Sequence, residues 1–330
     1  MNDGTTLAKV TSTELTAPRE TREQLADDLV AALDEGRSMP PMHLYDAHGS
    51  ALFERITQVA EYYLTRAEAE ILAREADAIV AAVRPHEIVE LGSGSSIKTG
   101  ALLTAMQRAG TGDRYAALDV STAALDEAAE RLSREHPRLW IDNYTGDFHT
   151  DLKHVPRSGT RLLLFLGSTL GNMRPAERRS LLTAVADSLR PGDAFLIGLD
   201  LVKDLDVLLP AYDDAEGVAA AFALNLLRVI NRELDADIPL EAFRYEAVWD
   251  PEEECVEMRL VAIRDVTARV GALDRTVTFA AGDRLVTEHS YKFRPERFAT
   301  ELASLGLVVE TVHTDSEELF AAVLARPVAD

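Results

Sequence analysis

The sequence has little cysteine and no grouping of residues that is typical of a metal site. Among its 330 residues there is one cysteine, Cys255, which excludes an internal disulfide and a cysteine-rich zinc site. The 8 histidines form no H-x-x-x-H pair and no Cys–His cluster, so we predict no metal. A single thiol suits a reducing compartment, and we expect a cytoplasmic protein.

Basic residues and long apolar runs are also scarce. The chain has 34 Lys+Arg against 56 Asp+Glu, a formal net charge of −22. So acidic a surface repels phosphate backbones and anionic lipid, and we expect neither a nucleic acid nor a membrane as partner. No apolar run approaches the roughly 18 residues that a membrane span needs. Residues 1–18 are polar and lack the apolar core of a secretory signal, so we predict a mobile arm there.

The remaining composition is that of a globular protein, with 47% hydrophobic and 27% charged residues. Short apolar segments alternate with helical ones up to about residue 200, which predicts βαβ units and a parallel sheet. Thr65 with Glu68 three residues later is typical of a capping box at a helix start. The predicted strands span 87–91, 114–120, 140–144, 161–166 and 194–199, and the predicted helices span 65–83, 96–107, 121–135 and 175–189.

The alternation stops after about residue 202. Two helices split by Pro210 and Gly217 are predicted at 204–234, followed by antiparallel strands at 242–249, 255–264 and 267–273 and a strand at 284–293. A helix at 295–305 and a hairpin at 307–314 and 319–325 close the chain. We therefore predict an α/β core over 61–202 and 287–330, with an inserted α+β domain made of 19–60 and 203–286.

A glycine-rich turn follows the first core strand. Gly92, Ser93 and Gly94 stand where the chain turns from strand to helix, and glycines there let backbone N–H groups approach a ligand. A dinucleotide-binding turn has a third glycine, and its place is taken by Ile97, which argues against NAD. The E-x-G-x-G form is similar to the S-adenosylmethionine loop of Rossmann-like methyltransferases. A G-x-G alone is weak, because any strand-to-helix turn can contain one.

Two further strand ends strengthen this interpretation. Asp119 ends the second core strand and is suited to accept the ribose hydroxyls of the cofactor. Asp147 and Phe148 follow the third, where they are suited to bind and cover the adenine. Each residue also has an ordinary structural explanation. Asp119 could be a solvent-exposed residue at a strand end, Asp147 could form a turn, and Phe148 could belong to the core. Together they lie at the carboxyl ends of parallel strands, the edge at which α/β sheets bind ligands.

Further motifs are linked in order after about residue 20, and together they are far more specific than the glycine loop. They include Tyr45-Asp46-Ala47, Glu61-Tyr62-Tyr63, Glu90-Leu91-Gly92-Ser93-Gly94 with Lys98-Thr99, Phe165-Leu166-Gly167-Ser168-Thr169 with Gly171-Asn172, Asp200-Leu201-Val202-Lys203-Asp204, Tyr212-Asp213-Asp214, Glu257-Met258, and Thr287-Glu288 with Ser290, Lys292 and Phe293. The set resembles the histidine Nα-methyltransferases of ergothioneine biosynthesis. That resemblance implies a Rossmann-like class I methyltransferase core with an inserted substrate-binding domain, and trimethylation of L-histidine to hercynine with S-adenosylmethionine as cofactor.

The resemblance also assigns residues. It places Gly92, Ser93, Gly94, Lys98, Asp119, Asp147 and Phe148 at the cofactor. It places Tyr45, Tyr62, Gly167, Asn172, Tyr212, Met258, Glu288 and Ser290 at the substrate, with Tyr45 and Asn172 closest to the chemistry.

Each substrate residue has a structural alternative. Asn172 would otherwise be a turn residue with positive φ, and the tyrosines would be half-buried core residues. Glu288 and Ser290 are two apart on a predicted strand and share a face, so a carboxylate and a hydroxyl could address the two imidazole nitrogens. Lys292 lies on the same face, and it could instead be the ion-pair partner of the carboxylate. Core packing would explain Met258.

Other functions remain open at this point. A relative on the same fold could methylate the α-nitrogen of tryptophan, tyrosine or phenylalanine, although Glu288 favours histidine. A non-catalytic S-adenosylmethionine-binding regulatory protein is a candidate from another class, and an NAD-dependent oxidoreductase is a third. The sequence contains no signal for the oligomeric state, and we expect a monomer.

Overall fold

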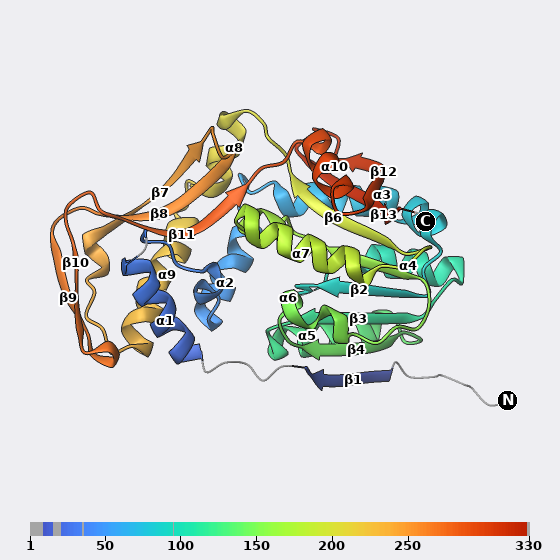
Figure 1. Cartoon of the computed structure of the whole chain (residues 1–330), viewed down its shortest axis with the longest axis horizontal. Helices are drawn as coiled ribbons and strands as arrows, with labels where there is room; N and C mark the ends of the chain where they lie inside the picture. Colours follow the sequence, from blue (N-terminus) through green and yellow to red (C-terminus); the bar gives the residue numbers. More distant parts are fainter. Residues whose placement is uncertain (1–8, 16–20, 35, 95, 329–330) are drawn as a thin grey trace. The chain divides into compact units, whose positions relative to one another are not determined.

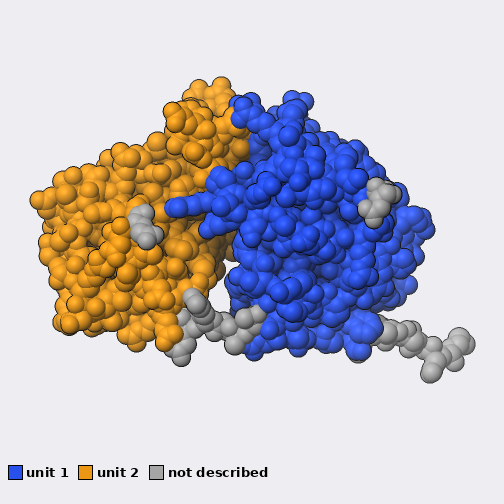
Figure 2. Space-filling model, viewed as in Figure 1, with its two compact units in different colours: residues 1–18, 64–201, 293–330 blue, residues 19–63, 202–292 orange. Residues whose placement is uncertain are grey.

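The computed structural model describes residues 9–15, 21–34, 36–94 and 96–328. The chain divides into two compact units, which Figure 2 shows in different colours. Unit 1 comprises residues 1–18, 64–201 and 293–330, and unit 2 comprises residues 19–63 and 202–292. That unit 2 is a substrate-binding domain stays a prediction.

Unit 1 contains an eight-stranded sheet in the order β1-β4-β3-β2-β5-β6-β13-β12 (Figure 1). The strands from β1 to β6 in this order are parallel, whereas β13 is antiparallel to both β6 and β12. The predicted alternation and the closing hairpin are confirmed. The strands are β1 (Lys9–Glu14), β2 (Glu87–Leu91), β3 (Arg114–Asp119), β4 (Trp140–Thr145), β5 (Arg161–Phe165), β6 (Ala194–Asp200), β12 (Leu307–Thr314) and β13 (Phe320–Pro327).

The prediction of a mobile arm is wrong for residues 9–14. These residues form β1, which extends the sheet by pairing in parallel with β4, from Lys9 opposite Trp140 to Glu14 opposite Thr145. The side chains of β1 are almost all exposed, so backbone hydrogen bonds rather than an apolar face hold the strand. Residues 1–8 and 16–18 of the predicted arm lie outside the described residues.

Helices cover both faces of this sheet. Alternate strand residues such as Val89 and Leu91 pack in one apolar cluster with Leu182 of α7 and Phe298 of α10. On the other face, the side chain of Asn143 in β4 donates to a backbone carbonyl of α5 (3.0 Å). The result is a doubly wound α/β layer structure. Its helices are α3 (Leu64–Val83), α4 (Gly100–Ala109), α5 (Thr122–Glu135), α6 (Phe148–Asp151), α7 (Pro175–Ser188) and α10 (Pro295–Ala303).

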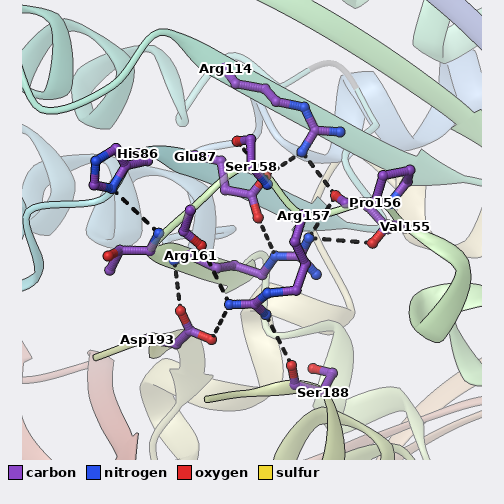
Figure 3. Close-up of polar contacts among 12 residues, drawn as sticks. His86, Glu87, Arg114, Val155, Pro156, Arg157, Ser158, Arg161, Ser188 and Asp193 are labelled. Carbon is purple, nitrogen blue, oxygen red and sulfur yellow. Dashed lines mark hydrogen bonds and ion pairs between the residues drawn. The ribbon is translucent and has the colours of Figure 1, made fainter. Parts of the chain in front are cut away.

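A buried ion-pair network joins the amino ends of the parallel strands (Figure 3). Glu87 begins β2 and lies in register between Arg114 of β3 and Arg161 of β5. Its carboxylate, which is fully buried, pairs with both guanidinium groups, at 2.7 Å to Arg161 Nε. Arg114 Nε also pairs with Asp142 (2.7 Å). These ion pairs compensate the buried charges and link the neighbouring strands β2, β3, β4 and β5.

An open pocket of about 850 Å³ lies at this same edge, lined by residues such as Gln107, Trp140 and Arg157. Ligands of parallel sheets bind at the opposite edge, beyond the carboxyl ends of the strands. The guanidinium groups of Arg114 and Arg157 already have carboxylate partners. We therefore place the functional site elsewhere.

Unit 2 combines helices with two small antiparallel sheets, β11-β8-β7 and β10-β9. The predicted strand at 267–273 is not part of the same sheet as the two before it. It forms β9 (Val266–Val270) and pairs with β10 (Arg275–Phe279), which was not predicted. The chain reverses between them at Asp274, whose φ is +46°.

Of the two residues predicted to split the helices, Gly217 is confirmed and Pro210 is wrong. Pro210 lies inside α8, and the break comes at 213–217, where Gly217 has a φ of +71° and precedes α9. The elements of unit 2 are α1 (Thr21–Asp34), α2 (Ala47–Ile56), α8 (Leu205–Tyr212), α9 (Val218–Glu233), β7 (Phe243–Asp250), β8 (Cys255–Ala262) and β11 (Arg284–Tyr291). Single 3-10 turns in the two units span Pro41–Leu44, Leu152–His154, Thr169–Asn172, Leu240–Ala242 and Gly271–Leu273. No helix in the described part of the chain is long and apolar enough to span a bilayer.

Candidate active site

The glycine loop at the carboxyl end of β2 is shaped to hold a ligand. Gly92 and Gly94 both have left-handed backbones, with φ of +61° and +48°, which side chains rarely adopt. Between them, the hydroxyl Oγ of Ser93 is buried and has no hydrogen-bond partner among the described residues. A buried polar atom is normally satisfied, so this one fits a site that a polar ligand completes.

Asp119 connects this loop to the next strand end. Its Oδ2 accepts the N–H of Gly94 (3.0 Å), and its Oδ1 accepts the N–H of Ser121 (2.9 Å). Each carboxylate oxygen has two lone-pair positions, so the group can accept further hydrogen bonds from ligand hydroxyls. The structure thus brings together Gly94 and Asp119, which the sequence nominated separately.

The segment after β4 lies beside the same loop. Asp147 is the N-cap of the short helix α6, and its Oδ1 accepts the N–H of His149 (2.9 Å). The ring of Phe148 packs edge-on against Phe165 (5.4 Å between centroids). A methyl group added at Gly92 would lie 3.7 Å from the Phe148 ring, so this aromatic side chain borders the glycine loop.

A buried carboxylate, that of Glu90, lies in β2 just before the loop. Glu90 accepts hydrogen bonds from Thr99 Oγ1 (2.7 Å) and from the hydroxyl of Tyr115. Burial raises its pKa from the usual 4.5 to about 7, although both of these hydrogen bonds act to lower it. Helix α4 begins only at Gly100, four residues later than predicted.

Glu68 is a site residue that the sequence interpretation missed. It does not close a capping box, because α3 already begins at Leu64 and the Glu68 carboxylate points elsewhere. Its two oxygens lie 2.8 and 3.0 Å from the N–H of Gly167, and it forms an ion pair with Lys98. Glu68 is fully buried, and a Cβ at Gly198 would lie 1.9 Å from its Oε1. A carboxylate that ties Lys98 to Gly167 cannot be recognised from local spacing.

Asn172 lies at the end of the turn that follows β5. It is the last residue of the 3-10 turn Thr169–Asn172, and the left-handed residues in this segment are Gly167 (φ +81°) and Ser168 (φ +57°). The alternative interpretation, in which Asn172 is needed for a positive φ, is therefore wrong. Its amide remains a candidate for a donor and acceptor toward substrate.

The predicted substrate residues of unit 2 form an aromatic and polar group. The rings of Tyr62 and Tyr212 pack edge-on (6.5 Å between centroids), and Tyr45 packs against Phe53 (5.5 Å) and Phe222 (5.2 Å). Although 39% of Tyr45 is exposed, the pKa of its phenol is raised well above the usual value, first by burial and then by Glu288 and Tyr62. Tyr45 therefore stays neutral at physiological pH.

Glu288 lies on β11, directly opposite Met258 of β8. Directly opposed residues of antiparallel strands share a face, so the carboxylate and the thioether lie side by side. Burial raises the pKa of Glu288 to about 7, while the charge of Lys292 acts to lower it. Tyr245 of β7 was missed by the sequence interpretation. Its register puts it on this same face, and its hydroxyl donates to the carbonyl of Tyr212 (2.6 Å).

Lys292 contacts two of the predicted substrate residues. Its Nζ lies 2.5 Å from Tyr212 Oη and 2.6 Å from Ser290 Oγ, and the two hydroxyl oxygens are 3.0 Å apart. The sequence suggested Lys292 only as a partner of Glu288, because Tyr212 is distant in the chain. No group of three or more His, Cys, Asp or Glu within the described ranges could hold a metal ion.

The chain is similar to several known proteins. Residues 25–327 match the family described as "Histidine-specific methyltransferase, SAM-dependent". The chain is 48% identical over 286 residues to "Histidine N-alpha-methyltransferase" of Mycolicibacterium smegmatis, covering 86% of this chain and 89% of that protein. It is 32% identical to "Ergothioneine biosynthesis protein 1" of Neurospora crassa, covering 89% of this chain but only 34% of that protein. Among solved structures, the mitomycin 7-O-methyltransferase MmcR has a similar fold, with a TM-score of 0.50, 17% identity and coverage of 93% of this chain and 67% of that one.

Proposed function

Because the chain belongs to the family of histidine-specific, S-adenosylmethionine-dependent methyltransferases, we propose that it methylates the α-amino nitrogen of L-histidine. The product is the trimethylated betaine hercynine, and the reaction is a step of ergothioneine biosynthesis. The observation that carries the proposal is the 48% identity to a histidine N-alpha-methyltransferase over most of both chains. The resemblance inferred from the motifs is thereby confirmed.

The residues at the carboxyl edge of the unit 1 sheet fit the cofactor. The buried Ser93 hydroxyl and the left-handed backbones of Gly92 and Gly94 support binding of a polar ligand at the loop. We assign Asp119 to the ribose hydroxyls, Asp147 and Phe148 to the adenine, and Lys98 to the same site. When bound, S-adenosylmethionine supplies a methyl group that its sulfonium already activates.

The chain's own contribution is positioning rather than acid–base chemistry. An amine attacks only as the neutral base, and the nitrogen must shed a proton before each transfer. Tyr45 is suited to orient the lone pair, because its phenol stays neutral and adds no competing charge. Asn172 can both donate to the substrate carboxylate and accept from the amine. Holding amine and methyl group in line removes a large part of the barrier.

The choice of histidine is supported by Glu288. Its carboxylate can accept the imidazole N–H, with Ser290 as a candidate partner for the other ring nitrogen and Met258 limiting the space beside them. A phenyl ring would bury the carboxylate without that partner, at a cost of about 1–3 kcal/mol. Tyr62 and Tyr212 remain the proposed ligands of the substrate carboxylate.

The test is incubation of the purified protein with S-adenosylmethionine and each of the twenty amino acids, followed by mass spectrometry. We expect histidine alone to gain the mass of three methylene groups, with S-adenosylhomocysteine as co-product. A gain on tryptophan, tyrosine or phenylalanine would transfer the proposal to another aromatic amino acid. Cofactor binding without any methylated product would point to a non-catalytic protein.

A further inference from the structure

Lys292 is a buried cation at the end of β11. Only 4% of its surface is exposed, and its Nζ bonds the hydroxyls of Tyr212 and Ser290. The same ammonium lies 4.4 Å from the centre of the Tyr212 ring. A buried lysine is stable as a cation only where such partners replace its lost hydration. All three residues belong to unit 2.

These contacts impose a direction on the two hydroxyls. A lysine ammonium has three donors and no acceptor, so the oxygens of both Tyr212 and Ser290 must accept from it. Each hydroxyl then keeps its own hydrogen to donate. The two oxygens are 3.0 Å apart, so both hydroxyls lie at one place. The hydrogen of Tyr212 can then be donated to the substrate carboxylate assigned to it above, and the hydrogen of Ser290 can be donated to an acceptor on the ring.

An acceptor stands beside this donor. Glu288 precedes Ser290 by two residues on β11, so both side chains lie on the same face of the strand. A neutral imidazole has one N–H and one nitrogen lone pair, on opposite sides of the ring. Its N–H matches the carboxylate, and its lone pair matches a hydroxyl that is oriented to donate.

We propose that Lys292 is a positioning residue that fixes the hydroxyls of Tyr212 and Ser290 as donors, so that unit 2 selects a ring with both an N–H and an acceptor nitrogen. This inference rests on the proposed function. In this proposal the second imidazole nitrogen is bound by a hydroxyl, and Lys292 acts only through that hydroxyl. A neutral residue at position 292 would leave the hydroxyls able to accept as well as donate.

The test compares three ligands with the full chain at saturating S-adenosylhomocysteine. Histidine offers both ring functions, a pyrrolylalanine offers N–H without an acceptor nitrogen, and a thiazolylalanine offers the nitrogen without N–H. Lys292→Met keeps the length of the side chain and removes its donors. By calorimetry at pH 8, we expect the affinity for histidine to fall roughly tenfold or more. The affinity for the pyrrolylalanine should change less, because this ligand has no acceptor nitrogen for the oriented donor. The preference for histidine over the pyrrolylalanine should therefore shrink. The affinity for the thiazolylalanine should fall with that for histidine.

A matched control exists in the same unit. Lys203 also bonds a tyrosine hydroxyl, that of Tyr63 (2.5 Å), and lies 4.4 Å from its ring centre. Lys203→Met should leave the preferences among the three ligands unchanged. If Lys292→Met does not fold, Ser290→Ala tests the same inference, because it keeps the lysine and removes an oriented hydroxyl; we expect the same selective loss.

The outcomes separate the inference from the proposed function. Equal losses for all three ligands in Lys292→Met, or in Ser290→Ala where that variant is used, would refute the positioning role and leave Lys292 as a structural residue. If the wild-type protein neither binds nor methylates histidine, the proposed function itself fails. S-adenosylhomocysteine should bind both variants as it binds the wild type, because its proposed site lies in unit 1.

Discussion

Replacing Asp119 with alanine should weaken cofactor binding without unfolding the protein. The carboxylate accepts the N–H groups of Gly94 (3.0 Å) and Ser121 (2.9 Å), and we assign its remaining lone pairs to the ribose. Alanine removes the ligand contact and also releases the glycine loop from the end of β3. Asp119→Asn keeps an acceptor but loses the charge, so it should fall between alanine and wild type.

The size of the effect follows from the type of bond. A hydrogen bond to a charged group contributes about 1.5–3 kcal/mol. Since about 1.4 kcal/mol corresponds to a factor of ten, the dissociation constant for S-adenosylhomocysteine should rise roughly 10- to 150-fold in Asp119→Ala. Loosening of the loop adds to this loss, so the lower figure is the minimum that we expect.

The assay is isothermal calorimetry with S-adenosylhomocysteine, together with thermal unfolding of the ligand-free variants. Asp113→Ala is the matched control, because Asp113 is an exposed acid just before the same strand at the opposite edge of the sheet. A dissociation constant for Asp119→Ala within about twofold of wild type would remove Asp119 from the site. A large drop in the unfolding temperature of the ligand-free variant would show instead that Asp119 acts mainly by holding the loop.

Three further predictions concern other carboxylates and the amide of the site. Asn172→Ala should lower the affinity for histidine but not for S-adenosylhomocysteine; normal histidine affinity by calorimetry would exclude the proposed contact. Glu288→Ala should lower kcat/KM for histidine roughly 10- to 150-fold relative to tryptophan and phenylalanine, whereas equal losses for every amino acid would mean that Glu288 only supports its strand. Burial raises the pKa of Glu90 from 4.5 to about 7, so its effect on folding is favourable below the lower value and is lost as the pH rises through about 7. Glu90→Gln should therefore gain about 3 kcal/mol relative to wild type between pH 5 and pH 9, and equal differences in unfolding temperature at the two pH values would contradict this.

The sheet of unit 1 was largely predictable because its strands are short apolar runs with clear ends. The predicted 87–91 matches β2 residue for residue, and 161–166 overshoots β5 by one. β1 was missed because its side chains are exposed, and a strand without a buried apolar face leaves no periodic apolar pattern. β10 was missed because it follows β9 after only a short 3-10 turn, Gly271–Leu273, and the left-handed residue Asp274.

The site was less predictable, for a different reason. Residues on one strand, such as Glu288 and Ser290, share a face by simple alternation, and spacing alone nominates them together. Glu68 and Lys292 depend on partners that lie far away in the sequence. For each of them, the local pattern predicted a partner close in the sequence. It predicted a capping box for Glu68 and an ion pair with Glu288 for Lys292. Long-range contacts of this kind emerge only when the fold is known.

The interleaved chain has a consequence for how the protein is made. Unit 2 includes residues up to 292. The sheet of unit 1 is completed only by β13, a buried strand that lies between β6 and β12. Neither unit can therefore close while the ribosome is still adding the middle of the chain, and most stabilising contacts are non-local. Apolar strand surface stays uncovered until β13 has been synthesised, and chains in such a state aggregate or need a chaperone. Folding yield should accordingly be sensitive to loss of β13, even though we assign it no residue that binds a ligand.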